Sequence, residues 1–195
     1  MQIKNLTVIR KSYSGERKIL NNINFIKDHD AADFIISEPG AGKTTLLETA
    51  AGLIRPSAGE IVLSKEIFLL LQIPERGFTS ATCREEAGGD FASVGLPMDI
   101  GDISPWSLSR GEKKRLAFAS ILNYNAGARG SLILLDDPFT DLDISGIRLI
   151  IDKIEKVGFS PLIATNREND PALFKERGIK VNIYRLSNGK LTKDK

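Results

Sequence analysis

Residues 34–47 read FIISEPGAGKTTLL, and this stretch decides the prediction for the whole fold. Its apolar start, residues 34–36, predicts a buried strand, and its glycine-containing centre, residues 38–42, predicts a loop. A helix is expected from Lys43 onwards. A strand, a glycine-rich loop and a helix that opens with Lys-Thr form the context of a phosphate-binding loop. We therefore expect backbone amides and the positive end of the helix to hold an anion here.

The residue types in this loop predict distinct roles. Two glycines let the backbone turn so that its amides point inward. Lys43 would reach the β- and γ-phosphates of a nucleotide, and the Thr44 hydroxyl would bind Mg²⁺. Ser37 stands where the motif usually has its first glycine, so we expect a slightly distorted loop. An ordinary strand–loop–helix turn is the alternative interpretation. The predicted ATP-binding residues of this stretch are Ser37, Glu38, Pro39, Gly40, Ala41, Gly42, Lys43, Thr44 and Thr45.

A second apolar run ends in two adjacent acids. Residues 132–143 read LILLDDPFTDLD, and the run 132–135 suits a strand that is buried on both faces of a sheet. A nucleotide site of this kind needs an acid that holds Mg²⁺ through water, and Asp136 fits that role. Asp137 would then polarise the attacking water. The alternative is that both acids only cap the end of the strand.

The composition of the chain excludes several classes of protein. It has 195 residues, of which 42% are hydrophobic and 27% charged, as in ordinary globular proteins. No apolar run approaches the roughly 18 residues of a membrane span. The net charge of +2 is too small to indicate nucleic-acid binding. Cys83 is the single cysteine, so a disulfide within the chain and a cysteine metal cluster are excluded. His29 is the single histidine. We interpret His29 as a surface turn residue.

Periodicity and turn residues predict an α/β protein with a mainly parallel sheet, antiparallel strands in its first third, and one domain over residues 1–195. Residues 77–107 are rich in Gly and Pro and are expected to form a reduced helical or inserted subdomain. The strands are expected at residues 2–9, 22–27, 33–37, 60–63, 67–72, 131–136, 160–165 and 181–186. The helices are expected at residues 43–53, 112–126, 144–158 and 170–178.

The segment 107–122, SLSRGEKKRLAFASIL, contains a helix start. Ser109 with Glu112 three residues later forms a capping box, and the simplest interpretation is a capped amphipathic helix. The order Leu-Ser-Arg-Gly-Glu also resembles the signature motif of ATP-binding-cassette (ABC) ATPases. That resemblance implies a P-loop NTPase fold of the ABC type. It also implies that Ser109, Arg110, Gly111 and Glu112 contact the ATP of a partner subunit.

Other motifs of that family follow in order along the chain. Tyr13 resembles the aromatic residue that stacks on adenine, and Gln72 resembles the glutamine that contacts Mg²⁺ and couples to a membrane partner. Residues 140–143, TDLD, resemble the loop that crosses the dimer interface. Residues 72–88 are similar to the same region in cobalt- and vitamin-importing ATPases of the energy-coupling-factor type.

Three departures from the family pattern concern catalysis and docking. The family has a glutamate as catalytic base where this chain has Asp137, one methylene shorter. Asn166 stands in place of the switch histidine; it can donate a hydrogen bond to the γ-phosphate but cannot carry a positive charge. The stretch between Gln72 and Leu108 is shorter than in full-length relatives. We expect intact nucleotide binding and slow hydrolysis, with Asp137, Asn166 and Gln72 nearest the chemistry.

The resemblance implies a motor subunit of an ABC transporter that uses ATP and Mg²⁺. Its partners would be a second ABC ATPase subunit, in a homodimer or heterodimer, and transmembrane transporter subunits. It would lie at the cytoplasmic face of the cell membrane, and import is favoured over export. One alternative is a nucleotide-dependent regulator that hydrolyses weakly or not at all. Another is a soluble ABC ATPase that acts on nucleic acid or ribosomes, although no nucleic-acid partner is expected.

Overall fold

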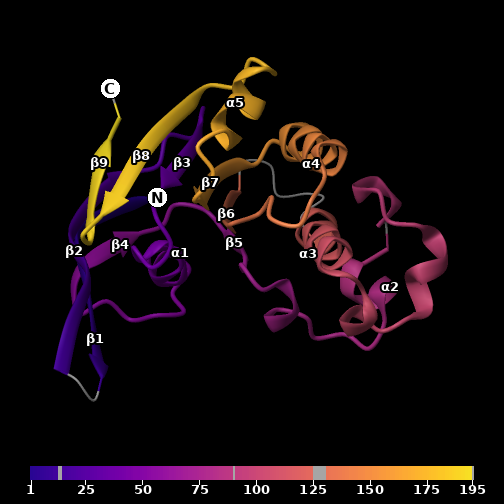
Figure 1. Cartoon of the computed structure of the whole chain (residues 1–195), viewed down its shortest axis with the longest axis horizontal. Coiled ribbons are helices and arrows are strands. Elements are labelled where there is room, and N and C mark those ends of the chain that lie inside the picture. Colours follow the sequence, from indigo (N-terminus) through magenta and orange to yellow (C-terminus); the bar gives the residue numbers. More distant parts are fainter. Residues whose placement is uncertain (13–14, 90, 125–130, 195) are drawn as a thin grey trace. The chain divides into compact units, whose positions relative to one another are not determined.

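The computed structural model describes residues 1–12, 15–89, 91–124 and 131–194. The chain divides into two compact units (Figure 1). Unit 1 consists of Met1–Leu69, Leu132–Asp136 and Ser160–Lys195. Unit 2 consists of Leu70–Ser131 and Asp137–Phe159. The boundary between Asp136 and Asp137 therefore falls between the two acids that end the second apolar run.

Unit 1 contains two sheets. The smaller sheet is antiparallel, with the strand order β2 (Gly15–Ile26), β1 (Gln2–Ser12) and β4 (Ala58–Val62). The larger sheet has the order β5 (Ile67–Leu70), β6 (Leu132–Asp136), β7 (Ser160–Thr165), β3 (Ala32–Ile36), β8 (Val181–Ser187) and β9 (Lys190–Lys193). The pairs β6–β7, β7–β3 and β3–β8 are parallel, and β8–β9 is antiparallel. The predicted α/β class, with a mainly parallel sheet and an antiparallel N-terminal part, is confirmed.

Strand β3 is buried along its whole length because side chains on successive residues pack on opposite faces of the sheet. Ile35 belongs to the core that includes residues of helix α1 (Lys43–Ala50) and of the antiparallel sheet. Phe34 points the other way and meets Phe174 of helix α5 (Asp170–Lys175) edge-to-face, with ring centroids 5.2 Å apart. Helix α1 ends earlier than the predicted residue 53, since Gly52 takes a positive φ of 81°.

Unit 2 is helical. Its helices are α2 (Cys83–Ala87), α3 (Arg110–Tyr124) and α4 (Ile144–Val157), and α3 packs against both others. Short 3₁₀ turns occupy Pro74–Arg76, Ala92–Val94, Met98–Asp102 and Pro105–Ser107. Cys83 is buried in α2, and this burial raises the pKa of its thiol. Throughout the described residues, every helix is too short or too polar to cross a lipid bilayer.

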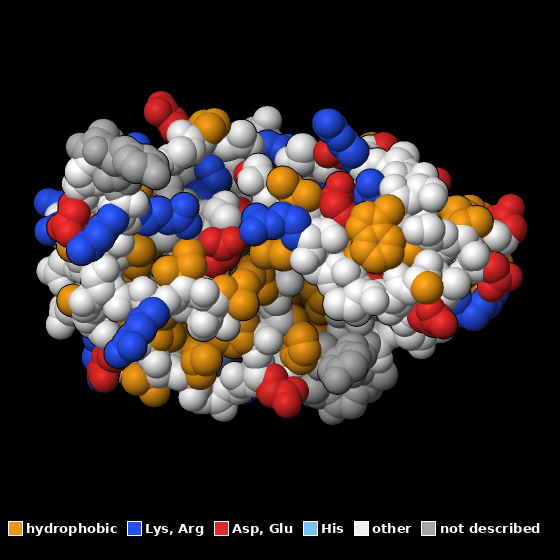
Figure 2. Space-filling view, turned by 90° about the horizontal axis from the view of Figure 1, so that it is seen from below, with side chains coloured by type: hydrophobic (Ala, Val, Ile, Leu, Met, Phe, Trp, Pro, Cys, Tyr) orange, Lys and Arg blue, Asp and Glu red, His pale blue; other side chains and the backbone are white. Residues whose placement is uncertain are grey.

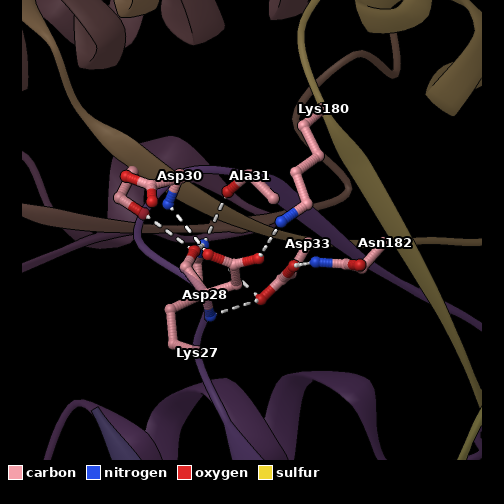
Figure 3. A network of polar contacts seen from close by, with 8 residues as sticks. Lys27, Asp28, Asp30, Ala31, Asp33, Lys180 and Asn182 are labelled. Atoms are coloured by element: carbon pink, nitrogen blue, oxygen red, sulfur yellow. Dashed lines mark hydrogen bonds and ion pairs between the residues drawn. The ribbon is translucent and has the colours of Figure 1, made fainter.

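A buried ion pair lies at the start of β3 in unit 1 (Figure 3). The side chains of Lys27 and Asp33 are both fully buried, with Nζ and Oδ2 3.5 Å apart. Asn182 of β8 donates to the other Asp33 oxygen at 2.7 Å, and the Asp28 amide donates to Oδ2 at 3.2 Å. Desolvation lowers the pKa of Lys27 and raises that of Asp33. His29, in the adjoining turn, is exposed, as the sequence predicts.

Candidate functional site

The phosphate-binding loop has the backbone geometry that its glycines allow. Gly40 and Gly42 take φ values of 79° and 105°, in the left-handed region that favours glycine. A Cβ at Gly42 would lie 3.1 Å from the side chain of Ile19, so close packing also restricts this position. Ser37 is not among the residues with positive φ. The expectation that Ser37 distorts the loop is therefore wrong, because the backbone at this position does not need the positive φ that favours glycine.

Lys43 lies at the first position of α1, and its side chain folds back along the loop. Its ammonium donates to the carbonyl oxygens of Ser37 and Glu38 at 3.0 and 3.3 Å and to the Ser37 hydroxyl at 3.2 Å. Only 6% of this lysine is exposed. The charge is thus held beside the backbone loop, where a phosphate group would replace these oxygen acceptors.

Thr44 and Asp136 come together from α1 and the end of β6. The Thr44 hydroxyl donates to Asp136 Oδ2 at 2.6 Å, and Asp136 is 1% exposed. Mg²⁺ prefers a few oxygen ligands of this kind, a hydroxyl and a carboxylate, together with waters and substrate phosphates. The pair therefore fits Mg²⁺: Thr44 would bind the ion directly and Asp136 through water.

A cavity of about 840 Å³ opens in unit 1 beside the loop. Ser37 belongs to its wall, and the Ser37 amide donates to the Thr165 carbonyl at 3.2 Å, which ties the loop to the end of β7. Asn166 follows directly and also lines the cavity. Tyr13, the predicted adenine contact, lies outside the described residues. The lining residues are Arg17–Ile19, Ile36–Ala41, Asn166, Glu168 and Arg185–Gly189.

In unit 2, Gln72 and Asp137 lie side by side. Gln72 Nε2 donates to Asp137 Oδ2 across 3.5 Å. Asp137 has a φ of 43°, a conformation that Asp adopts more readily than most residues. A third residue joins them: the buried ammonium of Lys114 donates to the backbone carbonyls of Gln72 at 3.0 Å and of Asp137 at 3.2 Å.

The signature segment forms the predicted capping box at the start of α3. Glu112 Oε2 accepts from the Ser109 amide at 2.9 Å and from the Ser109 hydroxyl at 2.6 Å. These hydrogen bonds hold the pKa of Glu112 below its usual range. Ser109 and Arg110 are exposed, so their side chains are accessible on unit 2.

Gly111 packs directly against the loop at residues 140–143. A Cβ at this position would lie 2.7 Å from the Asp141 carbonyl oxygen, and Asp141 itself has a φ of 67°. Asp143 ends the loop as the N-cap of α4 and accepts from the Gly146 amide at 3.1 Å. Arg115 of α3 pairs with Asp143 at 2.8 Å, so the signature helix and the loop are fastened together.

The sequence predicted most residues of the phosphate-binding site in unit 1 and of the Gln72–Asp137 and signature segments in unit 2, but it did not predict three contacts. It gave no role to Lys114. It did not foresee that Ser37 would accept a hydrogen bond from Lys43. It also did not identify the ion pair of Arg185 with Glu168 at the cavity wall. The signals were present as a lysine on an apolar helix face and as a serine at a glycine position.

Comparison with known proteins identifies relatives along most of the chain. An energy-coupling factor transporter ATP-binding protein EcfA2 of Caldanaerobacter subterraneus is 29% identical over 71% of this chain. The match spans 58% of that relative's own length. EcfA2 of Acetivibrio thermocellus is 26% identical over 92% of this chain and 75% of its own length. The expected similarity to energy-coupling-factor ATPases is therefore confirmed.

Two solved structures share the fold. The dimeric ABC transporter cassette MJ0796 superposes with a TM-score of 0.79 at 20% identity, covering 100% of this chain and 97% of that one. The structure of cbiO1 from Clostridium perfringens gives 0.73 at 20% identity, with 98% and 86% covered. A model of the ABC transporter family matches residues 20–140, more than half of the sequence. With the phosphate-binding loop, the Thr44–Asp136 pair and the signature segment all in place, the chain belongs to the ABC transporter family.

Proposed function

We propose that this chain is the ATP-binding subunit of a membrane transporter, and that it binds Mg–ATP in unit 1 and hydrolyses it slowly. The observation that carries the proposal is the 2.6 Å contact between Thr44 and Asp136 beside the glycine loop. Two oxygen groups from sequence-distant elements converge there next to a lysine that already binds oxygen acceptors. This is the donor set that a nucleotide triphosphate with its metal requires.

Each residue of the loop has a separate task in this proposal. The amides of residues 38–42 hold the phosphate oxygens, and the Lys43 ammonium leaves its carbonyl partners to meet the β- and γ-phosphates. Mg²⁺, when bound, supplies charge neutralisation between these phosphates. Asn166 donates an amide hydrogen bond toward the γ-phosphate, and Tyr13 stacks on the adenine ring.

Asp137 is the proposed general base, since it follows Asp136 directly in the chain. A carboxylate that orients the attacking water must lie within about 2.6–3.2 Å of it. Aspartate is one methylene shorter than the glutamate of the family pattern, so the carboxylate is set back from the water. Asn166 also contributes no positive charge to the transition state. Both departures predict slow hydrolysis, and they favour a regulator with weak turnover as the second candidate function.

The signature segment is proposed to act on a partner. Ser109 and Gly111 would contact the γ-phosphate bound by a second ABC ATPase subunit, identical or different. To do so, the Ser109 hydroxyl exchanges Glu112 for a phosphate oxygen. The Gln72 segment would pass the resulting motion to transmembrane subunits at the cytoplasmic face of the membrane. The direction of transport in this proposal is import.

A nucleic-acid function receives little support. The net charge is only +2. On the one face that Figure 2 shows, Lys and Arg side chains lie next to Asp and Glu side chains. Proteins that follow a phosphate backbone concentrate positive charge on one face.

Equilibrium titration with a fluorescent ATP analogue tests the binding part of the proposal. We expect saturable binding that tightens with Mg²⁺, is weakened at least tenfold by Lys43→Met, and shows no change with Lys190→Met, a surface variant on β9. An affinity that changes neither on removal of Mg²⁺ nor in Lys43→Met would contradict the proposed site.

A further inference from the structure

We propose that Lys114 is a positioning residue for the catalytic carboxylate, because its buried ammonium fastens the Asp137 loop to the Gln72 loop. The inference rests on the proposed function, since it assumes that Asp137 acts on the attacking water. It adds a residue to which the family motifs described above assign no role.

The geometry of this link is specific. Lys114 lies in the second turn of α3 and is 2% exposed. Its Nζ donates at 3.0 Å to the carbonyl of Gln72 and at 3.2 Å to the carbonyl of Asp137. These two residues are 65 positions apart in the sequence and are also joined through their side chains at 3.5 Å. Three residues therefore close a small ring of hydrogen bonds within unit 2.

A buried lysine at this position destabilises the fold unless its hydrogen bonds offset the desolvation of its ammonium group. Taking an ammonium group out of water is unfavourable by several kcal/mol unless hydrogen bonds satisfy it. The neighbouring inward positions of α3 carry the usual apolar residues, Leu116, Ala117 and Phe118. A long apolar side chain such as Met would fill the same space without that cost, so packing alone does not account for Lys114.

The backbone of Asp137 explains why such a link matters for chemistry. Its φ of 43° lies in a sparsely populated region and is retained only where surrounding contacts fix it. The direction of a short aspartate side chain follows the orientation of its own backbone. By holding the Asp137 carbonyl, Lys114 fixes the direction from which the carboxylate reaches the water. A displacement of about 1 Å in such a group costs on the order of 10²-fold in rate.

Nucleotide binding provides the internal reference for the test. Lys43, Thr44 and Asp136 belong to unit 1, whereas the ring of hydrogen bonds lies in unit 2. Because Gln72 of the ring is itself expected to contact Mg²⁺, the reference is the dissociation constant for ATP without Mg²⁺: loss of the link should lower kcat and leave that constant unchanged. Lys113 is the matched control, because the ammonium of this neighbouring lysine pairs with Glu75 at 3.5 Å and not with the carbonyls of Gln72 and Asp137.

The experiment compares Lys114→Met, Lys114→Arg and Lys113→Met in steady-state Mg–ATP turnover, alone and combined with Asp137→Asn. We expect Lys114→Met to lower kcat about tenfold, Lys114→Arg to restore part of it, and Lys113→Met to have no effect. In the Asp137→Asn background, Lys114→Met should have no further effect, since the group it positions is already gone. Two results would overturn the inference. One is an equal loss caused by Lys114→Met in both backgrounds, and the other is a kcat of Lys114→Met that equals the measurable kcat of the wild type.

Amide hydrogen exchange measured by mass spectrometry tests the link without turnover. Lys114→Met should speed exchange in residues 71–74 and 137–142 together, whereas Lys113→Met should not. Unchanged exchange in both segments would refute the link. If the Met variant does not fold, Lys114→Gln, whose shorter amide side chain removes the charge, takes its place in both measurements. Failure of the proposed function has a separate signature, namely a wild type without Mg–ATP binding or turnover.

Discussion

The hydroxyl of Thr44 lies 2.6 Å from a carboxylate oxygen of Asp136, although the two residues are 92 positions apart in the sequence. One belongs to the first turn of α1 and the other ends β6. The parallel sheet places the end of β6 and the start of α1 at one edge, as expected for a site at the carboxyl ends of parallel strands. This contact is the structural basis for predicting a metal-dependent nucleotide site.

Thr44→Ala should weaken ATP binding mainly in the presence of Mg²⁺. The variant removes one proposed ligand of the ion and leaves Asp136 without its hydroxyl donor. We expect about tenfold weaker binding with Mg²⁺, equivalent to about 1.4 kcal/mol, and little change with EDTA. Thr44→Ser keeps the hydroxyl and should bind as the wild type does. A similar loss with and without Mg²⁺ would show that Thr44 acts on the fold rather than on the metal.

Gly111→Ala should destabilise unit 2. The added methyl group would meet the Asp141 carbonyl oxygen at 2.7 Å, closer than a real contact allows, so the loop at residues 140–143 must shift. Overpacking of this kind costs about 1–3 kcal/mol. Thermal unfolding measures it, with Gly77→Ala as the control. A Cβ at Gly77 has its nearest neighbour at 3.5 Å, so equal melting temperatures for the two variants would argue against the close approach.

The buried Lys27–Asp33 pair predicts a strongly non-additive result. Asp33→Asn leaves the Lys27 ammonium buried without its carboxylate and should cost about 3–5 kcal/mol of unfolding free energy. Adding Lys27→Met removes the uncompensated charge and should recover much of the loss. Urea denaturation of the two single variants and the double variant provides the measurement. Additive losses would mean that the two side chains do not stabilise each other.

Asp28 predicts a loss of stability in acid. Its hydrogen bond from Lys180, at 2.8 Å, lowers the pKa of its carboxyl group from 3.8 to about 2 in the folded chain. A lowered folded-state pKa adds stability above pH 4, and this contribution disappears as the pH falls from about 4 to about 2. Asp28→Asn should therefore flatten the stability curve over that interval. Urea midpoints at several pH values test this, and an unchanged slope in the variant would refute it.

The sequence was most informative where one short segment contains its own context. The strand, loop and helix of residues 34–47 could be predicted because periodicity, glycine and Lys-Thr all agree there. The capping box of Ser109 and Glu112 could be predicted because both partners lie within one helical turn. In each case the contacts are local, so spacing alone determines them.

Contacts that depend on tertiary packing could not be predicted in the same way. Lys114 meets the backbone of two loops that only the fold brings together. The close approach of Gly111 to Asp141 likewise depends on how the loop returns past α3. Strand β2 begins at Gly15, well before the predicted residue 22, because hydrogen bonds to β1 extend the hairpin through polar residues that have no apolar alternation.

The prediction about Ser37 was wrong for a physical reason. It assumed that a non-glycine residue at the first position of the loop strains the backbone. Ser37 has no positive φ, so a side chain is tolerated there. Its hydroxyl instead accepts a hydrogen bond from Lys43, which a glycine could not do.

The central claim is that nucleotide binding is intact and that the short carboxylate of Asp137 limits hydrolysis. Steady-state Mg–ATP turnover of the wild type, Asp137→Glu and Asp137→Asn tests it most directly. We expect slow turnover in the wild type, an increase on the order of tenfold or more with Asp137→Glu, and a fall to a low but still measurable rate with Asp137→Asn. A wild type whose turnover is the same in Asp137→Asn, or is not increased by Asp137→Glu, would contradict the claim.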